Sequence, residues 1–210
     1  ISLTDPNDRH RQSPRTLGFI EFMTLAPNAR TFASLTVPNN AAEQSKTTIA
    51  IRDSQSCESV RAWVPDDSVG SLSYTADSRG LIVGSTEGLR YVAVDDVAES
   101  DTWAIPDSKE AWSAAYSPDG KTLAAVGESH WIRLWDAESG QPIGELIARS
   151  ALVSCVAWSP TSDWFVTGSY ELSVDGAPNR NVRIWNRDGM PKLTLNGHDH
   201  HVRCVAVAPD

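Results

Sequence analysis

One short stretch decides how this chain folds: Ala114–Gly120, which reads Ala-Ala-Tyr-Ser-Pro-Asp-Gly. Val156–Ser162 repeats the pattern as Val-Ala-Trp-Ser-Pro-Thr-Ser, and Val205–Asp210 begins it again. Weaker copies occupy Met23–Asn28 and Leu72–Asp77. With the proline position as marker (an alanine in one copy), the copies stand at 27, 76, 118, 160 and 209, in steps of 49, 42, 42 and 49 residues. Such a period indicates a repeated supersecondary unit.

A second marker follows each complete copy and keeps the same period. It reads Ile51–Asp53, Ala93–Asp95, Leu134–Asp136 and Ile184–Asn186, and its last residues are 42, 41 and 50 positions apart. Two polar, turn-rich insertions account for the longer steps, and both fall between the second and third apolar runs of a repeat: Val37–Lys46 and Glu171–Arg180. Insertions at one place in a repeat are typical of loops on one face.

Each repeat reads as strands rather than helices. The clearest copy has three apolar runs and a weaker fourth, separated by turns rich in Gly, Pro, Asp and Ser: Ala111–Tyr116, Thr122–Val126, Trp131–Trp135 and Pro142–Ile147. No window keeps the spacing of an amphipathic helix over three turns. The sequence therefore predicts an all-β protein with four antiparallel strands in each repeat.

A four-stranded sheet cannot bury both of its faces by itself, but neighbouring sheets can cover each other. Alternation along one strand places Ile132 and Leu134 on one side and Trp131, Arg133 and Trp135 on the other. We expect both sides to be buried between neighbouring repeats, with Trp135 among the most costly residues to truncate.

Composition is that of a globular protein, with 40% hydrophobic and 21% charged residues among 210. The net charge of −9 argues against nucleic acid or an anionic membrane surface as partner. No apolar run approaches the roughly 18 residues needed to span a bilayer, and Ile1–Asp5 shows no secretory signal. Cys57, Cys155 and Cys204 form no CxxC pair, which favours a reducing compartment such as the cytoplasm. We expect the last two to be small buried strand residues.

Four segments carry a family resemblance: Leu195–His198 with its Gly-His, Val202–Asp210, and the Trp-Asp or Trp-Asn endings of Ile132–Asp136 and Val182–Asn186. Together they resemble the WD-repeat (WD40) β-propeller family over nearly the whole chain. The resemblance implies blades of four antiparallel strands, with a structural signature at Trp135, Asp136, Trp185, Asn186, Gly197 and His198. Only one Gly-His is present, and Arg52 and Val94 replace Trp in earlier repeats. Such degenerate repeats resemble those of bacterial WD-repeat proteins.

The domain prediction is one propeller arc over residues 1–210. It consists of a partial blade at 1–18, four blades at approximately 19–62, 63–105, 106–148 and 149–196, and a partial blade at 197–210. Because ring closure commonly needs about 6 to 8 blades, we expect this sequence to be a fragment of a longer chain.

Catalytic motifs are missing from the sequence. It has no GxSxG, no HExxH and no Gly-rich phosphate loop, so we predict a protein that is not an enzyme and holds no cofactor or metal. The cluster with metal-ligand chemistry is His198, Asp199, His200 and His201. The resemblance makes His198 a structural loop residue, and metal binding is the minor alternative.

The resemblance implies that a protein or peptide docks on the wider face of the disc. The implied docking positions lie at the start of the first strand, at Trp112, Ser154, His201 and Arg203, and in the loop before the third strand, at Glu87 and Glu128. Trp and Arg are enriched in binding hot spots, which favours Trp112 and Arg203. The plainer alternative is a tryptophan packed between blades and a merely solvated arginine.

The function predicted from these observations is a non-catalytic protein-interaction scaffold, with no nucleic acid, membrane insertion or small-molecule substrate. One alternative is a regulatory propeller attached to a kinase, protease or redox domain outside this sequence. Another is a propeller that is itself an enzyme, which would need convergent carboxylates, histidines or a cofactor at its central channel.

Overall fold

The regular structure of the chain consists of sixteen β-strands in its described part. The computed structural model describes residues 18–38, 46–85, 87–94, 102–105, 108, 111–127, 131–147, 152–169 and 181–209. Among them, no helix has the length and apolar character that would let it cross a membrane. The two predicted insertions and the first residues lie largely or wholly outside these ranges.

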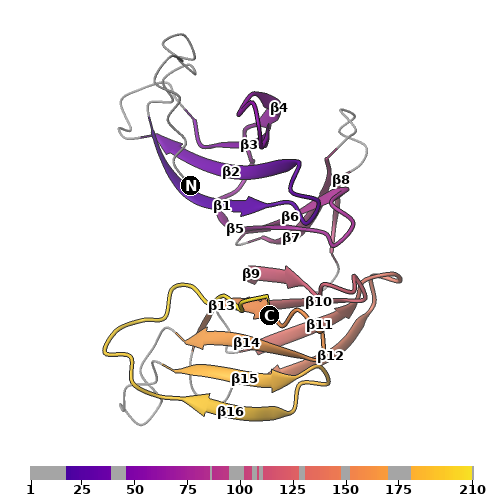
Figure 1. The fold of residues 1–210 in the computed structure, drawn as a ribbon, viewed down its shortest axis with the longest axis vertical. Helices are drawn as coiled ribbons and strands as arrows, with labels where there is room; N and C mark the ends of the chain where they lie inside the picture. The colour runs from indigo at the N-terminus through magenta and orange to yellow at the C-terminus, as the bar shows by residue number, and fades with distance from the viewer. Residues whose placement is uncertain are drawn as a thin grey trace.

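The strands form four antiparallel sheets, each built from consecutive strands in the order of the chain (Figure 1). Sheet 1 contains β1 (Gly18–Leu25), β2 (Thr31–Pro38), β3 (Thr48–Asp53) and β4 (Ser59–Trp63). Sheet 2 contains β5 (Val69–Tyr74), β6 (Gly80–Ser85), β7 (Gly88–Ala93) and β8 (Thr102–Ala104).

The second half of the chain repeats this arrangement twice. Sheet 3 contains β9 (Ala111–Tyr116), β10 (Thr122–Gly127), β11 (Trp131–Asp136) and β12 (Pro142–Ile147). Sheet 4 contains β13 (Val153–Trp158), β14 (Trp164–Ser169), β15 (Val182–Asn186) and β16 (Pro191–Leu195). The prediction of an all-β fold made of four-stranded antiparallel blades is confirmed. The partial blades predicted at both ends stay a prediction, and residues 1–17 lie outside the described part.

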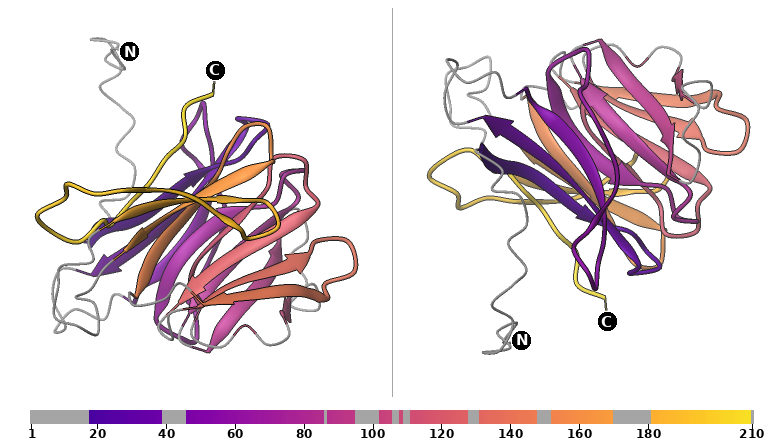
Figure 2. Two further views of the ribbon diagram at one scale, coloured as in Figure 1. Left: turned by 90° about the horizontal axis from the view of Figure 1, so that it is seen from below. Right: turned by 90° about the horizontal axis from the view of Figure 1, so that it is seen from above.

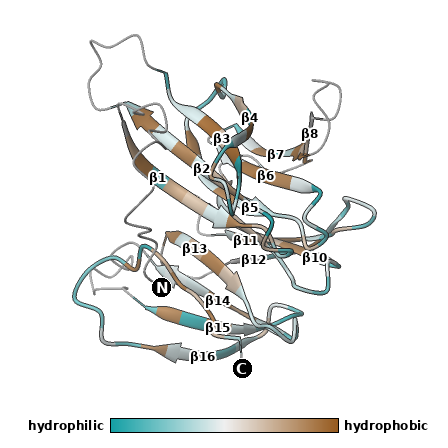
Figure 3. Cartoon of the chain, turned by 45° about the horizontal axis from the view of Figure 1, so that its top comes forward, coloured by the Kyte–Doolittle hydropathy of each residue, from teal (hydrophilic) through white to brown (hydrophobic). Residues whose placement is uncertain are grey.

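Consecutive sheets pack face to face, as the layered views in Figure 2 show. The first strands of the sheets, β1, β5, β9 and β13, are neighbours in space, because β5 contacts β1 and β9, and β9 contacts β13. We call them the inner strands. The end of the molecule where they begin is the leading face, and the opposite end, which carries the turn after each inner strand, is the turn face. Apolar residues follow the strands and polar residues the turns (Figure 3).

Three apolar clusters fill the spaces between the four sheets. Strand β6 serves two of them, since Leu81 and Val83 pack with sheet 1 whereas Ile82 packs with sheet 3. The side chains of strand β11 also point alternately to two neighbouring sheets, which confirms the prediction that its two sides face different neighbours. Ile132 and Leu134 face sheet 4, and the two tryptophans of β11 face sheet 2. Alternation of side chains along each strand therefore supplies both neighbours of a sheet.

The two faces that no other described sheet covers expose large apolar side chains. On β1 these are Phe19, Ile20, Met23 and Leu25, and around β16 they are Met190, Leu193 and Leu195. Between the sheets, comparable apolar side chains are removed from water by the neighbouring sheet.

The segment after β16 turns back beside the inner end of sheet 4 (Figure 1). Val202 N–H donates to Ser169 O at 3.1 Å, and Ser154 Oγ donates to Val202 O at 2.5 Å. Cys155 is buried in this contact, as predicted, and burial raises the pKa of its thiol. The expectation for Cys204 is wrong: it is exposed, because no described strand covers its side of the segment.

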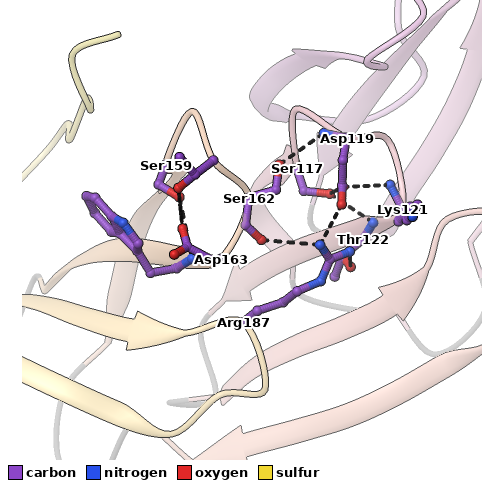
Figure 4. Close-up of polar contacts among 10 residues, drawn as sticks. Ser117, Asp119, Lys121, Thr122, Ser159, Ser162, Asp163 and Arg187 are labelled. Carbon is purple, nitrogen blue, oxygen red and sulfur yellow. Dashed lines mark hydrogen bonds and ion pairs between the residues drawn. The ribbon is translucent and has the colours of Figure 1, made fainter. Parts of the chain in front are cut away.

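A polar network ties the turn of sheet 3 to sheet 4 on the turn face (Figure 4). Arg187 donates to Asp119 Oδ2 at 2.6 Å, to Thr122 Oγ1 at 2.7 Å and to Ser162 O at 3.2 Å. Asp119 N–H donates to Ser162 Oγ at 3.0 Å. The bond from Arg187, with smaller contributions from Ser117 Oγ and Lys121 N–H, holds the pKa of the Asp119 carboxyl well below its usual range. The bonds from Arg187 to Asp119 and Thr122, and that from Asp119 to Ser162, join residues of neighbouring sheets that lie far apart in the sequence.

Candidate functional site

A β-bulge stands at the same place near the start of every inner strand. In β13, Val153 pairs with Ser169 and Cys155 with Gly168, which leaves Ser154 as an extra residue. The same register shift leaves Trp112 extra in β9, Gly70 in β5 and Glu21 in β1. A bulge redirects the side chain of the extra residue and increases the local twist, and bulges are common beside functional sites. The leading face therefore presents one redirected residue from each sheet.

Two of the predicted docking residues, Trp112 and Ser154, occupy these bulges. Both are half-buried. Alignment of the repeats places Arg203 at the equivalent position after Val202, and Arg203 is exposed. Glu21 and Gly70 are not among the predicted docking residues, although they stand two residues before Met23 and Leu72 and therefore align with Trp112 in the repeat.

The bulges of the neighbouring inner strands form a row, and a close contact joins two of them. A Cβ placed on Gly70 would lie 3.1 Å from Trp112 O, so the β5 bulge lies directly against β9. The Ser154 hydroxyl also lies 3.1 Å from Gly168 O, in addition to its bond to Val202 O. The structure thus brings Trp112 beside the β5 bulge, and Ser154 beside the segment that carries Arg203.

The remaining predicted docking residues are more scattered. Glu87 is exposed in the turn between β6 and β7, at the same end of the molecule as the bulges. His201 is exposed and precedes the row. Glu128 lies outside the described residues.

Within the described part of the chain, the row contains two buried polar groups without a hydrogen-bond partner. They are the indole Nε1 of Trp112 and the hydroxyl of Ser71, which follows the β5 bulge. A Cβ on Gly84 would lie 2.5 Å from Ser71 Oγ and 3.2 Å from Ala111 O, so only glycine at this position leaves room for the Ser71 hydroxyl and the Ala111 carbonyl. An unpartnered buried donor costs about 1–3 kcal/mol.

A cavity of about 400 Å³ opens between sheets 1 and 2 near the leading face. Its walls include Trp63 and the loop that joins β4 to β5. Arg90 forms ion pairs with Asp66 at 3.6 Å and with Asp67 at 3.2 Å at its rim. This part of the leading face is therefore hollowed and carries both signs of charge.

Three residues of the predicted structural signature take part in the packing and the turns of the sheets. Trp135 and Trp185 are buried, and Trp185 Nε1 donates to Thr167 Oγ1 at 2.9 Å across β14 and β15. Asp136 Oδ1 accepts bonds from Ser139 N–H at 2.8 Å and Ser139 Oγ at 2.7 Å, which close the turn after β11. These bonds, mainly that of the Ser139 side chain, lower the pKa of Asp136.

The histidine segment has a different character from the buried signature. Asn186, Gly197 and His198 are exposed, as are Asp199, His200 and His201. Within the described ranges, no three His, Cys, Asp or Glu side chains are grouped so that they could hold a metal ion. The structural role of His198 stays a prediction.

The fold and the row of bulges define a class of protein: consecutive four-stranded blades that present side chains on one face. Comparison with known families then places its repeats. The family model described as WD domain, G-beta repeat matches residues 140–186, and that of the anaphase-promoting complex subunit 4 WD40 domain matches residues 92–161. These matches show that residues 92–186 are similar to WD40 repeats.

Curated relatives agree with this placement. The chain is 27% identical over 161 residues to the nuclear distribution protein nudF of Emericella nidulans, which covers 69% of this chain and 36% of that protein. It is 28% identical over 179 residues to the WD repeat-containing protein VIP3 of Arabidopsis thaliana, covering 72% and 53%. It is 36% identical over 107 residues to the ribosome biogenesis protein WDR12 homolog of Nematostella vectensis, covering 48% and 24%.

The chain therefore spans between a quarter and about half of the length of these relatives. All three are eukaryotic proteins, so the expectation of bacterial-type repeats gains no support from them.

Proposed function

We propose that the chain is part of a non-catalytic WD40 scaffold that binds a protein or peptide on its leading face. The observation that carries the proposal is the row of bulges, with Trp112 and Ser154 at two of them and Arg203 at the equivalent position of the C-terminal segment. Side chains that a bulge redirects toward solvent are available to a partner without disturbing the apolar clusters between the sheets.

Trp112 supplies the most specific feature of this surface. Its ring is half-buried, and its Nε1–H is buried without a partner among the described residues. A docked peptide would cover the exposed part of the ring. Buried aromatic anchors with a polar handle are typical of interface hot spots.

The charges of the surface favour a polypeptide partner over a nucleic acid. Arg203 is an exposed cation of the row, but Glu21 and Glu87 are exposed carboxylates on the same face. With a net charge of −9 for the chain, a polyanion would be repelled at long range. A peptide with mixed charges meets no such barrier.

A pull-down from the lysate of the source organism tests the proposal. The bait is the wild-type chain or the double variant Trp112→Ala/Arg203→Glu, and a matched control is Met190→Ala/Lys192→Glu, which removes one exposed apolar residue and reverses one exposed charge around β16. We expect specific partners to be lost from the first variant and kept by the control, with both variants melting close to the wild type. Identical partner sets for all three baits would remove the leading face as the docking surface.

A further inference from the structure

The turn face has one junction between sheets that differs from its two neighbours. Between sheets 1 and 2, Asn28 N–H donates to Ser78 Oγ at 3.1 Å, and the Tyr74 hydroxyl donates to Thr31 Oγ1 at 3.2 Å. Each bond ties the turn end of one sheet to the next. The first joins two turns, and the second joins the last residue of an inner strand to the preceding sheet.

The junction between sheets 3 and 4 has the same two kinds of bond. Asp119 N–H donates to Ser162 Oγ at 3.0 Å, and Trp158 Nε1 donates to Ala115 O at 2.9 Å. Arg187 adds its contacts to Asp119. This junction is therefore closed at its turn end in the same way as the first.

Among the described residues, the middle junction, between sheets 2 and 3, has neither kind of bond. Gly120 stands where Ser78 and Ser162 stand in the neighbouring turns. All three residues share the left-handed conformation, with φ of 71°, 64° and 62°. The backbone is therefore the same, and the missing part is the hydroxyl. The hydroxyl of Tyr116, the counterpart of Tyr74 and Trp158, makes no hydrogen bond to another described residue.

Two adjoining cavities open at this middle junction, with volumes of about 480 and 170 Å³. Tyr91, Tyr116 and Ala137 line both. The Tyr91 ring packs closely against β6, where a Cβ on Gly80 would come within 2.1 Å of it. We call this feature the turn-face cleft.

Carboxylates are the charged groups that line the turn-face cleft. They are Asp77, Asp119, Asp136 and Glu138, and no lysine or arginine is among its described lining residues. Arg187 offsets Asp119 from the side of sheet 4. Asp77 Oδ1 accepts bonds from Thr75 Oγ1 at 2.6 Å and Arg79 N–H at 3.0 Å, which fix the carboxylate at the mouth of the cleft.

Tyr116 contributes a neutral ring and hydroxyl to the cleft. Burial, with smaller contributions from the nearby Tyr91 and Asp77, raises the pKa of Tyr116 to about 12. The phenol therefore stays protonated at neutral pH, and the face of its ring keeps the negative quadrupole that attracts cations.

We propose that the turn-face cleft binds the cationic side chain of an arginine or lysine from a partner polypeptide. The aliphatic stem would lie between Tyr91 and Tyr116, and the charged head would reach the Asp77 carboxylate. Aromatic faces and a carboxylate together suit a guanidinium or an ammonium group. The site is independent of the proposed docking surface, since it lies at the opposite end of the inner strands.

An NMR titration of the chain with a short peptide tests this site. The probe is acetyl-Gly-Gly-Arg-Gly-Gly-amide, and its control is the same peptide with citrulline, which keeps the shape and removes the charge. We expect saturable shifts of the Asp77 and Gly120 amide signals with the arginine peptide, and binding about tenfold weaker with citrulline. Equal binding of the two peptides, or no binding of either, would overturn the proposal.

Three variants locate the binding. Tyr116→Ala should weaken it about three- to tenfold. Gly120→Ser should abolish it, because the new hydroxyl can accept the Asp77 N–H and close the cleft as Ser78 and Ser162 close theirs. This variant keeps the test decisive if Tyr116→Ala does not fold. Tyr74→Phe, a change at the same repeat position in a closed junction, should bind as the wild type does. Unchanged affinity in Gly120→Ser would contradict the site.

Discussion

Phe165→Ala should be among the most damaging single substitutions in the chain. Phe165 is 0% exposed, with its ring centroid 5.1 Å from that of Trp158 and 6.3 Å from that of Trp185. A buried phenylalanine removes about 150 Å² or more from water, which at about 25 cal/mol per Å² gives roughly 4 kcal/mol. Measured Phe→Ala truncations of about 3–5 kcal/mol agree with that figure.

Thermal unfolding followed by circular dichroism measures the effect. For a chain of this size, about 4 kcal/mol corresponds to a fall in Tm of about 8–16 °C. The matched control is Phe19→Ala, because Phe19 is 54% exposed on the uncovered face of β1 and should lose about 1 kcal/mol or less. If both variants melted at the same temperature, Phe165 would not lie between two sheets, and the packing described here would be wrong.

Three further predictions concern the turn face. Arg187→Ala should destabilise the chain by about 1–2 kcal/mol at neutral pH, measured by urea unfolding. Because the folded-state pKa of Asp119 is lowered, the stabilisation from its pair with Arg187 is fully present above the ordinary Asp pKa and is lost as pH falls through the folded-state pKa. The difference in stability between variant and wild type should therefore shrink in acid, and a difference that grew would contradict the pairing. Ser162→Ala should cost more than Ser162→Gly, since both lose the bond to Asp119 but only glycine relieves the left-handed backbone; the reverse order in melting temperature would refute this account. Gly80→Ala should cost about 1–3 kcal/mol, because the new methyl group would meet the Tyr91 ring, and an unchanged Tm would show that the ring does not lie there.

The repeat and its strands could be predicted closely from the sequence. The predicted run Ala111–Tyr116 is β9, and Pro142–Ile147 is β12, residue for residue. This works because the turn residues between strands are local signals, such as Gly120 with its positive φ. The two sides of β11 also followed from alternation alone.

The bulges and the contacts between sheets could not be predicted in the same way. A bulge at Trp112 depends on its pairing with β10, and no local residue pattern specifies it. Arg187 reaches Asp119 across 68 positions of the sequence, so only the packing of sheet 4 on sheet 3 brings the two together. The turn-face cleft could not be predicted from the sequence either. Ser78 and Ser162 each accept a hydrogen bond from the preceding sheet, and glycine at the same position, Gly120, has no hydroxyl to do so.

The exposed Cys204 shows the same limit of sequence patterns. It occupies the same repeat position as Cys155, but burial there depends on which segment lies alongside. Val202 covers Cys155, and its carbonyl accepts a contact from the thiol at 3.7 Å. A repeat position therefore predicts where a side chain points more securely than it predicts what covers it.

Consecutive sheets bury each other's apolar faces, and a double-mutant cycle across one junction tests this packing most directly. Leu134 of sheet 3 and Phe165 of sheet 4 belong to one buried cluster, although neither pairs with the other in a strand ladder. Urea unfolding of Leu134→Ala, Phe165→Ala and the double variant should give a coupling energy of about 0.5–3 kcal/mol. Strict additivity of the two losses would mean that these sheets do not cover each other.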